Sequence, residues 1–64
     1  MKLQISTNDD RLITSDELNK SSGEIYQILS AAFDRGTFIR FFVKEIPTIV
    51  PFGVLNTSII QIIE

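Results

Sequence analysis

The chain opens with an alternation of apolar and polar positions. Between Lys2 and Thr7, Leu3 and Ile5 point to one side and polar residues to the other, a pattern typical of a half-buried strand. Asn8-Asp9-Asp10 then predicts a turn, because Asx side chains hydrogen-bond their own backbone. We predict that Arg11–Thr14 returns as the second strand of a hairpin; an irregular link into the next helix is the alternative.

The apolar period then becomes that of a helix. Apolar residues recur at i, i+3, i+4, i+7 and i+8, which makes one apolar stripe. They are Ile25, Ile28, Leu29, Ala32 and Phe33. Ser21 to Glu24 fits a capping box, and Gly36 supplies a left-handed C-cap. We predict the main helix over 24–35.

A second capping box precedes this helix. Thr14 to Glu17 has the same Thr/Ser-x-x-Glu pattern, in which the two end residues satisfy each other's backbone N–H groups. It predicts a single helical turn near Asp16 to Asn19, with Leu18 pointing inward.

The central strand is predicted over Thr37–Ile46, which is dense in aromatic and β-branched residues. Pro47 is expected to end it, since proline cannot donate to a ladder. Side chains alternate across a strand, so the two faces differ. One face, with the properties of a core, carries Ile39, Phe41 and Val43; the other carries Phe38, Arg40, Phe42, Lys44 and Ile46.

Three shorter segments complete the chain. Thr48–Phe52 is predicted as a short edge strand, Gly53–Asn56 as a turn, and Thr57–Ile63 as the last strand. The last strand is apolar on both faces, which is typical of strands that are covered on both. One short helix covers only one face of a small sheet, so we expect a second subunit on the other.

These elements predict one α+β domain over residues 1–64. A small mixed or antiparallel sheet of about four strands would pack on one amphipathic helix, in the order ββαββ. That order is compatible with a β-grasp-like fold. The strand–turn–strand rhythm of Val50–Ile60 occurs in many small bacterial and phage proteins and specifies no family.

The composition limits what holds such a domain together. The hydrophobic core of a 64-residue chain contributes about 3–5 kcal/mol to the free energy of unfolding. Small proteins therefore add disulfides, metals or partner subunits. The chain has no Cys, hence no disulfide, and no His, the commonest metal ligand and general base. A partner subunit remains, and eleven isoleucines favour self-association. We expect a homo-oligomer, with a dimer favoured.

Charge and hydropathy bear on the compartment. The net charge is −2 with a pI near 4.9, so no overall field attracts nucleic acid or anionic membrane. The N-terminus lacks the apolar region of a signal peptide, which predicts a cytoplasmic protein. The stretch Ile46–Ile63 is uncharged, but Pro47, Pro51 and Gly53 would interrupt a spanning helix, so buried strands are predicted instead.

Few residues are candidates for a metal, phosphate or catalytic site. Asp9, Asp10, Asp16 and Glu17 could ligate Ca²⁺ or Mg²⁺, but a turn and a helix start account for them. Ser21-Ser22-Gly23 could hold a phosphate, yet the P-loop pattern is absent and capping explains the residues. No serine has a His partner, and nothing marks a Ser–Lys pair. We predict a non-enzymatic protein without metal or cofactor.

The basic-aromatic face of the central strand carries the functional hypotheses. In the first, Phe38 and Phe42, with Ile60 and Ile62 of the last strand, form a self-association interface, because aromatic residues are enriched in interfaces. The chain is then a regulatory or accessory module that also binds another macromolecule. In the second, single-stranded nucleic acid stacks on the aromatics while cations follow the phosphates. Those cations are Arg35, Arg40 and Lys44. Burial of this face within one monomer is the third possibility.

Overall fold

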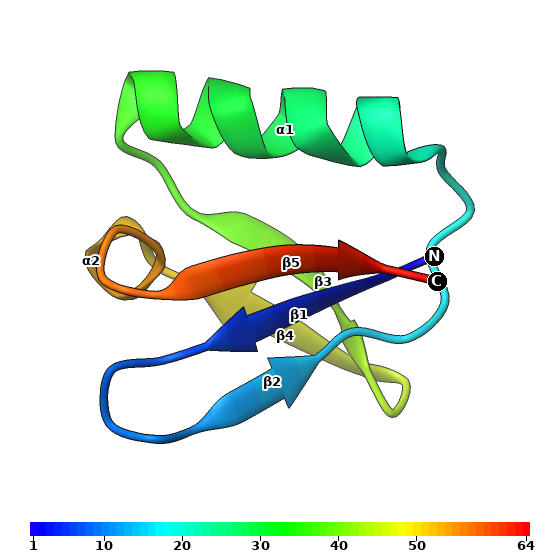
Figure 1. Ribbon diagram of the computed structural model, residues 1–64, viewed down its shortest axis with the longest axis horizontal. Coiled ribbons are helices and arrows are strands. Elements are labelled where there is room, and N and C mark those ends of the chain that lie inside the picture. The colour runs from blue at the N-terminus through cyan, green and yellow to red at the C-terminus, as the bar shows by residue number, and fades with distance from the viewer.

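The computed structural model describes all residues from 1 to 64. Its elements are β1 (Lys2–Ser6), β2 (Leu12–Thr14), α1 (Ser22–Arg35), β3 (Ile39–Val43), β4 (Ile46–Val50), α2 (Phe52–Leu55) and β5 (Ile59–Ile63). The strands form two antiparallel sheets, one ordered β2-β1-β5 and the other the β3–β4 hairpin. In Figure 1, α1 runs along one side of the molecule and the hairpin crosses behind the three-stranded sheet.

The predicted α+β class with one main helix is confirmed, and so is the hairpin of the first two strands. The single sheet of about four strands in the order ββαββ is not confirmed. The chain adds the short helix α2 and a fifth strand, and β3–β4 stays separate from the other sheet. β5 pairs with β1 in antiparallel fashion, so the topology also differs from a β-grasp.

The main helix has the predicted caps and begins at Ser22, two residues before the predicted start. Ser21 is the N-cap, its hydroxyl accepts from the Glu24 N–H, and the Glu24 carboxylate accepts from the Ser21 N–H, which completes the capping box. Gly36 ends the helix in the left-handed region at φ 64°. Ile25 and Ala32 are buried on the core side, whereas Ile28 remains 46% exposed. The apolar stripe is therefore wider than the core that it covers.

The predicted helical turn near Asp16–Asn19 is wrong, because the segment is an irregular link that is hydrogen-bonded to both sheets. The buried hydroxyl of Ser15 accepts from the Leu3 N–H, and the Ser15 N–H donates to the Leu3 carbonyl. The next residue, Asp16, donates its N–H to the Phe42 carbonyl at 2.8 Å. Because the N–H groups of Ser15 and Asp16 are hydrogen-bonded to strands of the two sheets, no helical turn forms here. Leu18 does pack against the core, as predicted.

The predicted central strand Thr37–Ile46 is two strands and a turn. β3 ends at Val43, Lys44 and Glu45 adopt φ of 51° and 66°, and Ile46 begins β4. Positive φ at both central residues is the signature of the two-residue hairpin turn. Pro47 therefore lies within β4, where it is tolerated because β4 pairs on one side only.

The C-terminal elements also have bounds that differ from the predicted ones. The predicted edge strand Thr48–Phe52 is β4, which starts two residues earlier and ends at Val50. Most of the predicted turn Gly53–Asn56 belongs to α2, and β5 starts at Ile59 rather than Thr57. The Thr57 hydroxyl donates to backbone carbonyls of α2, which extends the turn and delays the strand.

The core lies between the two sheets and α1. It consists of Leu3, Ile5, Ile25, Ala32, Ile39, Phe41, Val50 and Leu55. The predicted inward face of the central strand is thereby confirmed for Ile39 and Phe41, while Val43 is half-buried. None of the helices has the length and apolar character needed to cross a membrane.

Candidate interaction surface

The outward side of the β3–β4 hairpin exposes large apolar side chains from two adjacent strands. The antiparallel register sets Arg40 opposite Ile49 and Phe42 opposite Pro47, and residues opposite each other share a face. Phe38 precedes β3 in the same alternation. We call these five residues the hairpin face. Phe38 is 53% exposed, Phe42 56% and Ile49 63%.

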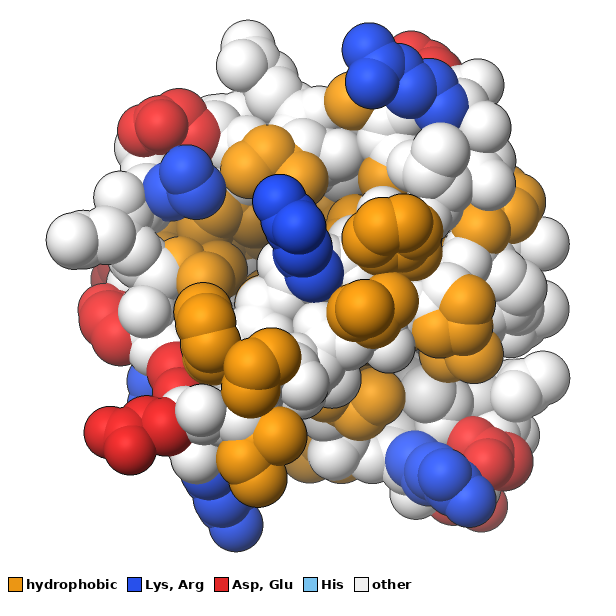
Figure 2. Space-filling model, turned by 180° about the vertical axis from the view of Figure 1, so that it is seen from behind, with side chains coloured by type: hydrophobic (Ala, Val, Ile, Leu, Met, Phe, Trp, Pro, Cys, Tyr) orange, Lys and Arg blue, Asp and Glu red, His pale blue; other side chains and the backbone are white.

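The space-filling view shows how this side of the molecule is composed. In Figure 2, which looks onto the side where the hairpin lies, hydrophobic side chains gather around one central basic side chain. Acidic and basic side chains occupy mainly the margin of the same view. This side therefore combines an apolar surface around one basic side chain with a charged rim, and aromatic residues and arginine are both enriched in interaction surfaces.

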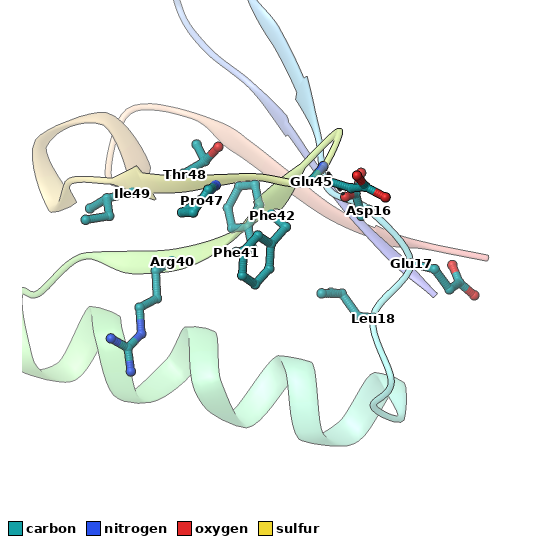
Figure 3. A pocket seen from close by; sticks show the side chains of 10 residues that line it. All are labelled: Asp16, Glu17, Leu18, Arg40, Phe41, Phe42, Glu45, Pro47, Thr48 and Ile49. Atoms are coloured by element: carbon teal, nitrogen blue, oxygen red, sulfur yellow. Dashed lines mark hydrogen bonds between the residues drawn. The ribbon is translucent and has the colours of Figure 1, made fainter.

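An open hollow of about 900 Å³ lies against the hairpin face and the link that precedes α1. Its lining includes three carboxylates, Asp16, Glu17 and Glu45, and one guanidinium, Arg40. Figure 3 shows Asp16 and Glu45 together at the hairpin turn, whereas Arg40 extends from the other end of β3 toward α1. The hollow is therefore acidic at the turn and basic away from it.

Asp16 also fixes the hairpin turn. One carboxylate oxygen accepts from the Lys44 N–H at 2.7 Å and the other from the Glu45 N–H at 2.8 Å. Both residues of this turn have positive φ, a conformation unfavourable for side chains of this size. Charge-assisted hydrogen bonds to both N–H groups offset that cost. Sequence reasoning missed the turn because Lys-Glu carries none of the Asn-Gly signal that marks it.

Glu17, which also lines the hollow, is held by the chain terminus. Its carboxylate accepts from the Met1 ammonium at 2.6 Å. That hydrogen bond, with the charges of the ammonium and of Lys2, lowers the pKa of Glu17 below its ordinary value of 4.5, against a smaller opposing effect of desolvation. The Glu17 charge is thus already paired, whereas Asp16 and Glu45 have no cationic partner at the turn.

A second hollow extends the hairpin face toward α1. Its lining includes Ile28 and Arg35 of the helix together with Phe38 and Arg40 of the hairpin side. The ion pairs of the structure are Met1–Glu17 and Asp9–Arg11, so neither arginine is neutralised by a carboxylate within the chain. Lys44, the third predicted nucleic-acid contact, lies at the turn and lines neither hollow.

Ile60 and Ile62 lie elsewhere. They stand opposite Ile5 and Leu3 in the β1–β5 ladder, so they point toward the core and are half-buried. They line a separate hollow with α1 residues such as Tyr26. The structure brings Phe38 and Phe42 together, and Arg35 near Arg40, but it separates the two isoleucines from the hairpin face. Ile59, on the other side of β5, is 68% exposed.

The other residues considered for metal or phosphate binding make local contacts instead. Asp9 accepts from the Thr7 hydroxyl and pairs with Arg11, and the hydroxyl contact is the main cause of its lowered pKa. The Ser21 hydroxyl caps α1. No group of three or more His, Cys, Asp or Glu side chains is placed to hold a metal ion.

Comparison with known proteins adds no further identification. No family model, no curated protein and no solved structure matches this chain. The geometry of the hairpin face is therefore the observation from which a function can be inferred.

Proposed function

We propose that this chain is a small non-enzymatic interaction module that works as a homo-oligomer and contacts macromolecules through the hairpin face. One observation carries the proposal: three apolar side chains, Phe38, Phe42 and Ile49, are each more than half exposed on one side of the hairpin. Monomeric proteins rarely leave contiguous apolar patches uncovered unless they bind there.

The size of the core supports a partner subunit. Only eight apolar residues are buried, and Ile5 and Leu55 are the only large side chains buried completely. Domains of this length bury a small fraction of their surface and are marginally stable alone. Binding that occurs only in the folded state adds to stability by mass action. Covering the hairpin face would contribute in this way.

Single-stranded nucleic acid is the alternative occupant. Arg40 lies between Phe38 and Phe42 along the chain, and exposed aromatic rings with a neighbouring cation suit base stacking and phosphate contact. Against this, Asp16, Glu17 and Glu45 line the hollow that touches the same face, and the net charge is −2. Carboxylates at the site repel phosphates, so we favour a protein surface.

The test is the mass of the chain in solution, measured by light scattering after size exclusion over a dilution series. We expect the wild type to form a dimer and Phe42→Asp to be monomeric, because a carboxylate cannot be buried in an apolar contact without a partner. Circular dichroism should show that the variant is folded, since Phe42 is exposed.

Tyr26→Asp is the matched control. Tyr26 is 60% exposed on α1 and lines the separate hollow with Ile60 and Ile62. It should keep the dimer mass. The opposite result would move the interface to that hollow. A wild type that stays monomeric at every concentration contradicts self-association, and binding of a labelled oligonucleotide that Phe42→Asp abolishes would favour the alternative.

A further inference from the structure

We propose that the occupant of the hairpin face is a second copy of the same face, related by a twofold axis that sets Arg40 of each chain opposite Glu45 of the other. The inference rests on the proposed function and specifies the partner and the geometry. It follows from the distribution of charge over the face, which is complementary to itself when reversed.

Each charged group in this arrangement lacks a partner within its own chain. Arg40 forms no ion pair, and neither does Glu45, whose backbone alone is bound, by Asp16. Both residues nevertheless line the same hollow, Arg40 on β3 and Glu45 at the turn. A surface that is basic at one end and acidic at the other attracts an antiparallel copy of itself, and complementary charges set the orientation of such contacts.

The apolar residues fit the same axis. Phe42 lies between Arg40 and Glu45 along the chain, so a twofold axis midway between those charges brings Phe42 against its own counterpart. In a twofold interface the same patch is used by both chains, and a contact from one residue to another occurs twice. Each dimer would thus contain a central pair of Phe42 rings flanked by two Arg40–Glu45 pairs.

The solvent-accessible surface area of the chain indicates how stable the dimer should be. A standard stable interface covers about 800 Å² per partner, which is about a sixth of the 4662 Å² exposed by this chain. The hairpin face with its flanks on the link and α1 occupies one side of a molecule that measures 25 × 24 × 19 Å. We expect an interface no larger than this standard size, and hence a dimer that dissociates on dilution.

The experiment reverses the two charges separately. Arg40→Glu sets a new carboxylate against Glu45 of the other chain, and Glu45→Lys sets a new ammonium against Arg40. Each variant alone should therefore dimerise at least about tenfold more weakly than the wild type, because like charges then face each other. An equimolar mixture should regain dimer mass, because unlike variants restore both pairs. Glu45→Lys suits the turn, since Lys44 already adopts the same left-handed conformation.

Two control variants change the net charge equally but away from the hairpin face. Arg11→Glu lies in the β1–β2 turn and Glu64→Lys at the C-terminus, and both residues are exposed. Each control, and their mixture, should dimerise like the wild type. A gain on mixing that is confined to the Arg40 and Glu45 variants therefore reports a specific contact rather than net charge.

A second measurement does not depend on charge. The chain has no cysteine, so Phe42→Cys introduces a single thiol at the expected axis. Under mild oxidation it should form a covalent dimer faster than Ile59→Cys, which is exposed on the other sheet. Equal rates would place residue 42 away from the axis and overturn the geometry.

The outcomes separate this inference from the proposed function. If the wild type dimerises, Phe42→Asp is monomeric and the charge variants behave like their controls, the twofold geometry is wrong while self-association through the face stands. If mixing restores association but the mass exceeds two chains, the contact is head-to-tail and the twofold axis is wrong. If the wild type is monomeric throughout, both proposals fail.

Discussion

Asp16 is a residue whose role follows from its position in the fold. Its N–H joins the link to β3 and its two carboxylate oxygens hold the Lys44–Glu45 turn. The sequence places it in an apparent capping box, which the structure does not form. A short side chain next to a sheet edge is bound by the nearest free N–H groups, and these belong to a turn 28 and 29 residues away.

Replacing this side chain should weaken the hairpin. We expect Asp16→Ala to lower the free energy of unfolding by about 1–2 kcal/mol, because two charge-assisted hydrogen bonds to strained backbone are lost at a partly exposed site. Urea denaturation by circular dichroism measures the change. Asp34→Ala, an exposed position on α1, should shift it by less than about 0.5 kcal/mol. Equal effects of the two substitutions would contradict the proposed role of Asp16.

Among the elements, α1 is set by local signals and the β3–β4 hairpin is not. The capping box, the apolar stripe and Gly36 each act over short distances along the chain, and the predicted helix and its two caps are confirmed. The hairpin turn is hydrogen-bonded to Asp16, which lies outside it. Its strands are also apolar enough to resemble one continuous strand that ends at a proline.

The capping box makes α1 sensitive to acid. The backbone N–H of Ser21 donates to the Glu24 carboxylate and, with the Ser21 hydroxyl and the charge of Lys20, lowers the pKa of Glu24 below its ordinary value of 4.5. A lowered pKa in the folded state means that the ionised carboxylate adds stability above pH 4.5, and that this is lost as the pH falls through the folded-state pKa.

We therefore expect Glu24→Gln to reduce stability at pH 7 and to match the wild type more closely at about pH 3, because the contribution of the ionised carboxylate declines as the pH falls below 4.5. Urea denaturation at the two pH values measures the difference. Glu64→Gln changes a carboxylate that accepts no hydrogen bond, and it should show no such convergence. A stability gap for Glu24→Gln that is equal at both pH values would rule out the linkage.

The whole molecule is a small core closed from three sides by two sheets and a helix. Leu55 of α2 is fully buried and contributes to the core from a segment that the sequence predicts as a turn. With so few buried side chains, each one accounts for a large share of the stability. The exposed hairpin face is the other consequence of this size, because one helix and two small sheets cannot cover every apolar side chain.

Truncating the core should unfold the chain. Leu55→Ala removes a buried side chain at a cost of about 2–5 kcal/mol, which is comparable with the whole stability of about 3–5 kcal/mol expected for a domain of this size. We expect no cooperative thermal transition for this variant, while Ile59→Ala, at a position 68% exposed, should melt like the wild type. A Leu55→Ala variant that melts within a few degrees of the wild type would show that α2 is peripheral.

What the sequence determined by itself is the local part of this protein. The first hairpin, the main helix with both caps and the inward positions of β3 follow from side-chain period and from capping groups within a few residues, and all are present. The two exposed phenylalanines of the basic-aromatic face also follow from that period, since alternation alone places Phe38 and Phe42 opposite the core side.

The tertiary structure decided everything that depends on distant partners. Asp16 accepts hydrogen bonds from the Lys44–Glu45 turn, and the link is hydrogen-bonded to both sheets through Ser15 and Asp16. Pairing with β1 orients Ile60 and Ile62 toward the core. Such contacts join groups that lie far apart in the chain, so no periodicity within one segment records them. Arg40 and Glu45 are close in the chain, but only the β3–β4 turn, held by the distant Asp16, places both on one hollow, unpaired within the chain.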